Sequence, residues 1–181
     1  MNGTIPIGNN YEIVALSSQP DVIGALADIL IEVVAGGGSV GFMHPVAKQE
    51  ANGFWQASLE AAARRSRVVL GAHDHGQLIG TVTLLLDCPE NQPHRAEIAK
   101  LMTRVSYRGQ GVARALLLEA ERVAVQEGRS MLTLDTAAEG GAAGLYEGMG
   151  YQKAGIIPDF ALKPHGGLTA TIIYWKRIAK P

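Results

Sequence analysis

Apolar residues recur along the chain with two different periods, about 3.6 residues in some segments and 2 in others, and their order predicts the fold. The helical period is clearest in 112–128, where charged side chains occupy the opposite face. It also predicts a helix in 20–38, with Pro20 in its first turn and consecutive glycines at its end, and a helical region at roughly 46–65. A short helix is expected in 140–150.

Short runs of β-branched and apolar residues between turn residues predict the strands. The runs 67–72 and 78–86 flank the turn HDHGQ and form a hairpin. Further strands are predicted at 11–18, 96–105, 130–136, 151–156 and 169–178. Because the helix 112–128 connects the strands 96–105 and 130–136, these two strands should be parallel. The order favours a single α/β (α+β) domain over the whole chain, with a mixed, mainly antiparallel sheet of six to seven strands and helices on both faces.

Composition and charge narrow the classes of function. The net charge of −1 includes no basic block, which argues against a nucleic-acid partner, and no apolar run approaches the ~20 residues that a membrane span needs. The first residues, MNGTIPIGNN, lack the basic and apolar stretches of a signal peptide. Cys88 is the only cysteine, so neither a disulfide framework nor a thiolate metal cluster is expected. These features favour a protein of the reducing cytoplasm.

The segment RGQGVA, residues 108–113, joins a strand to the strongest helix. The first turn of a helix has unpaired N–H groups and a partial positive charge, so it is a natural anion site. The glycines and Ala113 keep large side chains away from those amides. The segment is neither a Walker loop nor a dinucleotide fingerprint, because no Lys-Ser or Lys-Thr and no third glycine follow. A phosphate site and a tight strand-to-helix turn both remain open on this evidence.

The pattern Arg108-x-x-Gly111-x-Ala113 resembles the acyl-CoA pyrophosphate loop of the GNAT superfamily of N-acetyltransferases. The later segment GLYEGMGYQKAG (144–155) resembles a second motif of that superfamily, and the order of elements also agrees. Within the superfamily, the tabtoxin-resistance acetyltransferases are the most similar group. The stretches that carry this finer resemblance are GGGSVGFM (36–43), HRAEIAKLM (94–102), LTLDT (132–136) and TATIIYWK (169–176).

The resemblance implies a GNAT fold and acetyl-CoA as co-substrate, without a metal. Backbone groups at the strand edge would hold the pantetheine arm, and the glycine loop would wrap the pyrophosphate. The implied strand residues are Leu101, Met102 and Thr103, and the implied loop residues are Arg108, Gly109, Gln110, Gly111, Val112, Ala113 and Arg114. A backbone N–H near Met102 is the expected donor to the thioester oxyanion.

An amine must be neutral to attack a thioester, and alkylamines have a pKa near ~10.4, so a general base is needed. Alternation places Glu97 with Ala99 and Leu101 on one face of an apolar strand, which makes Glu97 a candidate base; an ion pair with Arg95 or Lys100 is the structural alternative. Asp135 ends its strand, where it could hold the substrate ammonium or share the base role, or simply serve a turn. The resemblance to the tabtoxin-resistance group implicates both carboxylates in catalysis.

Tyr146 lies on the predicted short helix. By resemblance it would protonate the departing CoA thiolate; the alternative is a half-buried tyrosine that packs the helix on the sheet. Ser39, Phe42 and Met43 follow the three glycines and could form a mobile apolar wall over the amine, or a plain linker between helices. His73 and His75 flank Asp74 in the hairpin turn, where a solvated turn is more plausible than a metal site.

The expected function is acetyl transfer from acetyl-CoA to a primary amine of a small molecule, by direct attack in a ternary complex. No motif positions a cysteine to carry the acyl group, which disfavours a ping-pong route. The alternatives are acetylation of a protein amino group, a non-catalytic acyl-CoA sensor and a nucleotide-binding module. A role in antibiotic or toxin resistance follows from the subgroup resemblance alone, and a homodimer from the habit of the family.

Overall fold

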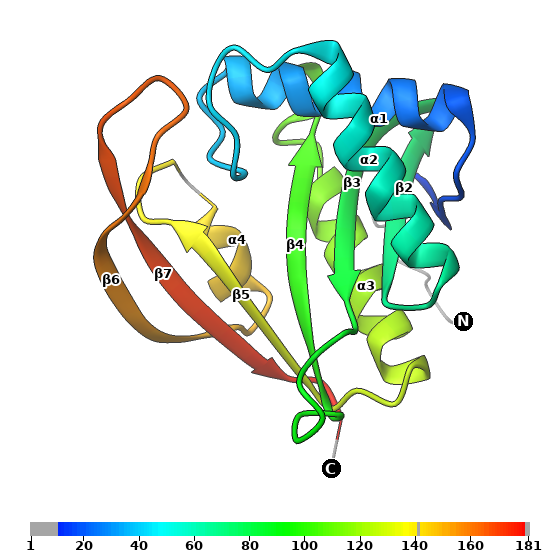
Figure 1. Cartoon of the computed structure of the whole chain (residues 1–181). Coiled ribbons are helices and arrows are strands. Elements are labelled where there is room, and N and C mark those ends of the chain that lie inside the picture. Colours follow the sequence, from blue (N-terminus) through cyan, green and yellow to red (C-terminus); the bar gives the residue numbers. More distant parts are fainter. Residues whose placement is uncertain (1–10, 141, 180–181) are drawn as a thin grey trace, which may run out of the picture.

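The computed structural model describes residues 11–140 and 142–179, and these form one open sheet in the order β1-β2-β3-β4-β5-β7-β6 (Figure 1). The strands are β1 (Glu12–Ala15), β2 (Arg67–Asp74), β3 (Gln77–Leu85), β4 (Arg95–Thr103), β5 (Met131–Ala137), β6 (Gln152–Leu162) and β7 (Leu168–Arg177). The pair β4–β5 is parallel, and the other described pairs are antiparallel. The predicted mixed sheet and its parallel pair are therefore confirmed.

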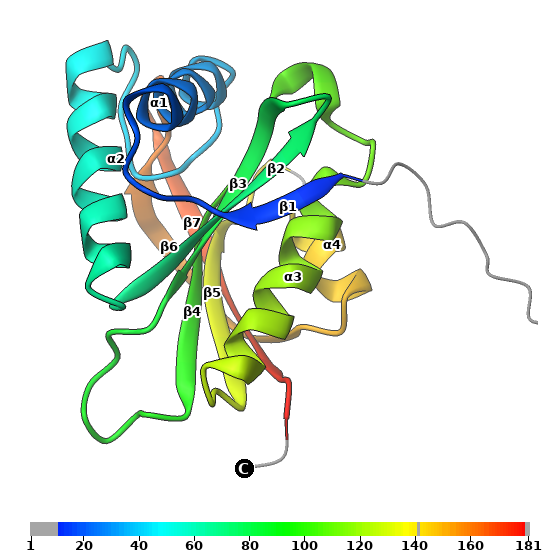
Figure 2. The same ribbon diagram turned by 90° about the vertical axis from the view of Figure 1, so that its right-hand side faces the viewer.

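Helices cover both faces of this sheet, as predicted. They are α1 (Pro20–Ala35), α2 (Lys48–Ala63), α3 (Val112–Gln126) and α4 (Ala143–Gly148), with a short 3-10 turn at Val105–Tyr107. Figure 2 shows α1 and α2 on one face and α3 and α4 on the other. None of the helices in the described ranges is long and apolar enough to cross a membrane. Residues 1–10, read above as lacking a signal peptide, and Gly141 of the predicted short helix lie outside the described residues.

Each face of the sheet has its own apolar core. On the α3 and α4 face, strand residues such as Ala96, Ile98 and Leu132 pack with the buried stripe of α3 and with Tyr146 of α4. On the other face, Met102 packs with α1 and α2. Burial of these side chains stabilises both helical layers by roughly 1.5–3 kcal/mol per large residue.

One boundary prediction was wrong at the end of the chain. The strand predicted at 151–156 is instead β6, which continues to Leu162. Pro158 and Asp159 conceal this continuation in the sequence, because proline and aspartate are both depleted in strands. The pairing with β7 shifts register between Ile157 and Ala161, which accommodates both residues.

Strands β4 and β5 separate soon after they meet. Their pairing covers Arg95–Glu97 against Met131–Thr133. Beyond these residues the two strands diverge, as Figure 1 shows. The edge of β4 that faces β5 therefore has no neighbouring strand over its second half. The start of α3 lies near this free edge.

Candidate active site

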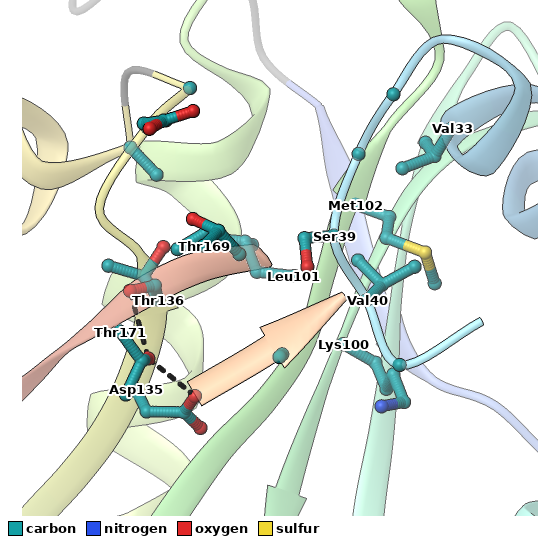
Figure 3. A pocket seen from close by; sticks show the side chains of 18 of the residues that line it. Val33, Ser39, Val40, Lys100, Leu101, Met102, Asp135, Thr136, Thr169 and Thr171 are labelled. Atoms are coloured by element: carbon teal, nitrogen blue, oxygen red, sulfur yellow. Dashed lines mark hydrogen bonds between the residues drawn. The ribbon is translucent and has the colours of Figure 1, made fainter. Parts of the chain in front are cut away.

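A cleft of about 650 Å³ lies between the diverging strands β4 and β5. Its walls come from both strands, from the segment after α1, from the start of α3, from α4 and from the hairpin β6–β7. Figure 3 shows Lys100, Leu101 and Met102 on one side of the cleft and Asp135 and Thr136 on the other. The glycine-rich segment after α1, the second half of β4, the glycine loop, the end of β5 and α4 therefore meet at one cleft, although they lie far apart along the chain.

A β-bulge shapes the β4 wall. Thr83 of β3 pairs with Ala99, and Thr81 pairs with Met102, so β4 has one extra residue over this stretch. Lys100 in the bulge has a φ of 51°, which is uncommon for a residue with a side chain. The bulge reverses the alternation, and Leu101 packs against the α3 and α4 core. The prediction that Leu101 shares a face with Glu97 was therefore wrong.

The β4 edge offers backbone groups to a ligand. Leu101, Met102 and Thr103 all line the cleft, as the resemblance implied. With no strand beside this edge, its N–H and C=O groups are available to a ligand that carries amides of its own. An extended amide chain such as the pantetheine arm fits that requirement.

The glycine loop lies where α3 begins. Gly109 and Gly111 have φ values of 73° and 86°, and Gly111 caps the helix. A Cβ atom at either position would meet no heavy atom within 4 Å. Glycine is therefore favoured here by the left-handed backbone, and the space beside it is open to a ligand. The first helical hydrogen bond runs from Ala115 N–H to Gly111 C=O, so the preceding amides are unpaired within the helix.

The positions of the seven predicted loop residues differ. Arg108 and Ala113 line the cleft. Val112 is buried in the core, so its backbone alone is available, and Arg114 is exposed outside the cleft lining. Gln110 fastens the loop instead of lining the cleft, because its side chain donates to the carbonyl oxygen of Ser106 over 2.8 Å.

Residues from distant elements hold the loop in place. Tyr11 Oη donates to the carbonyl oxygen of Gln110 (3.1 Å), and Tyr107 Oη donates to Asp74 Oδ2 (3.1 Å). Glu32 of α1 accepts hydrogen bonds from the Val105 N–H (2.5 Å) and from Arg104 Nη1 (3.1 Å). The end of α1 and the loop are thereby joined, which makes the cleft geometry a property of the whole fold.

Asp135 stands in the cleft wall with an oriented carboxylate. The Thr171 hydroxyl donates to Asp135 Oδ2 over 2.9 Å and lies 3.0 Å from the carbonyl oxygen of Thr136 (Figure 3). Asp135 itself is exposed, so its charge reaches the space inside the cleft. Sequence reasoning found Asp135 and missed Thr171, which comes from β7 and is adjacent only in the folded protein.

Tyr146 also lines the cleft, from α4. It is 6% exposed, and its ring lies 5.8 Å from those of Tyr151 and Tyr174. Burial, helped by the negative charge of Asp135, raises the pKa of Tyr146 to about 12. The phenol is thus a hydrogen-bond donor at neutral pH, and it both packs the helix and reaches the cleft.

Glu97 lies outside the cleft lining. It is on the paired stretch of β4, opposite Thr133, and Arg95 Nη1 stands 3.4 Å from its Oε2. Arg95 also donates to Thr133 Oγ1 over 2.8 Å. The ion pair considered as an alternative is present, and the Glu97 side chain is 40% exposed.

The segment after α1 lines the cleft with one of the three residues predicted there, Ser39. Ser39, Val40 and Gly41 line the cleft, whereas Phe42 and Met43 do not. The Phe42 ring packs edge-on against Phe54 at 5.1 Å, and Met43 is exposed. Packing against apolar side chains stabilises an aromatic residue more than a position in the solvent-exposed wall of a cleft does. The sequence pattern does not distinguish these two positions.

The His73, Asp74 and His75 turn does not form a metal site in the described structure. Within the described ranges no group of three or more His, Cys, Asp or Glu side chains could hold a metal ion. Asp74 of the hairpin turn instead accepts a hydrogen bond from Tyr107.

Lys100 lines the cleft, although it was not predicted to. Burial lowers the pKa of Lys100, and the negative charge of Asp135 partly offsets this effect. The sequence signal that points to it is a lysine inside the apolar run IAKLM (98–102).

The comparisons with known proteins agree with this architecture. The acetyltransferase (GNAT) family model matches residues 40–151. Human N-acetyltransferase 8B is 34% identical over 86 residues, which are 46% of this chain and 38% of that protein, so the match spans less than half of either.

Solved structures extend the likeness over nearly the whole chain. An N-acetyltransferase from Staphylococcus aureus Mu50 has a TM-score of 0.78 at 18% identity, covering 94% of this chain and 100% of that chain. The protein yncA from Salmonella typhimurium, solved with its cofactor acetyl-CoA, has a TM-score of 0.78 at 15% identity, covering 96% of each chain. At these identities the likeness concerns the fold.

Proposed function

The chain belongs to the acetyltransferase (GNAT) family, and we propose that it transfers the acetyl group of acetyl-CoA to a primary amine of a small molecule. The observation that carries this proposal is the cleft between β4 and β5. It has a free strand edge along one wall, a helix start beside it and an oriented carboxylate on the opposite wall. An amine and a thioester could meet there from opposite faces of the sheet.

Acetyl-CoA would be held by the parts already described, and when bound it supplies an activated acyl group. The unpaired amides at the start of α3 would bind the pyrophosphate, with Arg108 at the rim. The free edge of Leu101–Thr103 would pair with the pantetheine amides. In yncA, the fold is solved with that cofactor, which supports the assignment by analogy.

The protein groups divide the chemistry among them. Asp135, held by Thr171, would accept a hydrogen bond from the amine and take the proton lost on attack. A backbone N–H of β4 near Met102 would stabilise the oxyanion. The neutral phenol of Tyr146 would donate a hydrogen bond to the leaving thiolate. Cys88 is outside the cleft lining, which supports direct attack in a ternary complex over an acyl-enzyme.

The finer parts of the proposal rest on the sequence. The resemblance to the tabtoxin-resistance group supports a role in resistance to a toxin or antibiotic. The single cysteine supports work in the cytoplasm, and the family habit supports a homodimer.

The test is release of CoA thiol from acetyl-CoA across a panel of small amines and lysine-bearing peptides, with acetylated products identified by mass spectrometry. Small amines should be acetylated with higher kcat/KM than peptides. Preference for peptides would replace the acceptor class, and tight acetyl-CoA binding without any release would favour a sensor.

A further inference from the structure

Lys100 lies in the cleft wall, and among the described residues the carboxylate that acts on it, Asp135, does so electrostatically and without an ion-pair contact. It lines the cleft from the bulge of β4. No carboxylate oxygen of the described residues lies within 4.0 Å of its ammonium group. By contrast, the nearby Arg95 and Arg104 each have a carboxylate partner. An unpaired, partly buried charge is costly, so its retention needs an explanation.

The surroundings hold the ammonium group without neutralising it. Lys100 Nζ lies 5.7 Å from the centre of the Phe54 ring, and a Cβ atom at Gly41 would be 3.4 Å from Nζ. Gly41 therefore gives the lysine head room beside the segment after α1. An aromatic face attracts a cation, but it leaves the donors of the ammonium group free for a ligand.

The position on the fold indicates which ligand the lysine faces. Phe54 belongs to α2 and Gly41 follows α1, so Lys100 points to the face covered by these two helices. The glycine loop begins α3, which covers the opposite face. Lys100 is therefore placed for the acceptor and not for the pyrophosphate of acetyl-CoA.

We propose that Lys100 binds an anionic group of the acceptor, so that the substrate is an amine that also carries a carboxylate or similar anion. Lys100 and Asp135 come from the two diverging strands and line the same cleft (Figure 3). The substrate amine would lie toward Asp135 and the substrate anion toward Lys100. Burial lowers the pKa of Lys100, and a bound anion would oppose that shift. The inference rests on the proposed acetyl transfer.

The test compares L-amino acids with their carboxamides as acceptors, because each pair differs in the anionic group while its side chain is the same. The measured quantity is the ratio of kcat/KM for acid over amide, from CoA thiol release. Taking the ratio between variants cancels the different amine pKa values within a pair. The variants are Lys100→Met, which keeps length and removes charge, Lys100→Arg, which restores charge, and Lys153→Met as the control. Lys153 is exposed on β6 outside the cleft lining.

In the wild type the acids should be the better acceptors once amine ionisation is allowed for. Lys100→Met should lower the acid-to-amide ratio roughly 10- to 150-fold, the range for one charge-assisted hydrogen bond, while the affinity for acetyl-CoA stays unchanged. Lys100→Arg should recover part of the preference, and Lys153→Met should leave it intact. An equal loss for acids and amides in Lys100→Met would overturn the inference.

A binding measurement separates failure of this inference from failure of the proposed function. Calorimetry on the CoA-loaded protein compares N-acetyl-amino acids with their amides, and needs no turnover. Tighter binding of the acids that disappears in Lys100→Met supports the anion site even if no amine is acetylated. Equal binding of acids and amides would refute the anion site, whatever the outcome of the turnover assay.

Discussion

Replacement of Gly111 by valine tests whether backbone amides hold the pyrophosphate. Gly111 caps α3 with a φ of 86°, a conformation that costs L-residues roughly 1–2 kcal/mol and is least tolerated by β-branched side chains. A Cβ atom there would meet nothing within 4 Å, so the substitution creates no clash with the protein. The backbone is expected to move instead, and the unpaired amides of Val112–Arg114 would lose their common direction.

The magnitude follows from the bonds at stake. A hydrogen bond to a charged group contributes about 1.5–3 kcal/mol, so the loss of one amide contact should raise the Kd for acetyl-CoA roughly 10- to 150-fold. Arg108 is exposed at the rim of the cleft, where an ion pair contributes about 1 kcal/mol or less. Arg108→Ala should therefore raise the Kd about fivefold at most.

Titration calorimetry of both variants with acetyl-CoA measures the difference. Gly128→Val is the matched control, because Gly128 has a φ of 73° and open space around it at the other end of α3. It imposes a similar strain on the helix while leaving the loop intact, and its Kd should equal that of the wild type. Equal losses in Gly111→Val and Arg108→Ala, or an equal loss in the control, would refute the dominance of the backbone amides.

Three further variants test the acceptor chemistry. Asp135→Asn should lower kcat/KM about 10²- to 10⁴-fold with acetyl-CoA affinity unchanged, measured by thiol release and calorimetry; a loss under tenfold would remove the base role. Tyr146→Phe should lower kcat more than KM, and because the raised pKa of about 12 keeps the phenol protonated, the wild-type kcat should show no fall from Tyr146 ionisation up to pH 10. Glu97→Gln should leave the pH profile of kcat/KM unchanged, since Glu97 pairs with Arg95 outside the cleft lining; a shifted basic or acidic limb would return Glu97 to the base role.

The parts of the fold that could be predicted are those governed by local periodicity. The stripe of α3 and the strands on either side of it were enough to predict the parallel pair β4–β5. The glycines at 109 and 111 were recognisable because their left-handed conformation is a local property of the turn. Where the backbone conformation itself requires glycine, the residue type alone predicts the turn.

The errors along β4 and β5 came from features that depend on the partner strand. The bulge at Lys100 is defined by pairing with Thr81 and Thr83, and simple alternation along β4 cannot detect the extra residue. For the same reason Leu101 was placed on the wrong face, and Lys100 was considered only as an ion-pair partner of Glu97. Thr171 holds Asp135 across a β5–β7 pairing that connects positions 36 residues apart. Such contacts need the three-dimensional register.

The bulge joins the two halves of the proposed site. One extra residue in β4 turns Leu101 toward the α3 and α4 core and leaves Lys100 on the side of α1 and α2. The cofactor and the acceptor would then approach from opposite faces and meet only where β4 and β5 separate.

Two hydrogen bonds hold the end of α1 and the segment after it, which lies on the proposed acceptor side of the cleft, against the β6–β7 turn. His44 N–H donates to the carbonyl oxygen of Pro164 over 2.9 Å, and His165 Nε2 lies 3.0 Å from the carbonyl oxygen of Ala35. These contacts tie the end of α1 and the segment after it to the β6–β7 turn without involving the glycine loop. Substitutions in this tie should therefore change the choice of acceptor while the affinity for acetyl-CoA is retained. Glu32 lies outside this tie and connects α1 to the start of the glycine loop, so its loss should weaken both the acceptor site and the binding of acetyl-CoA.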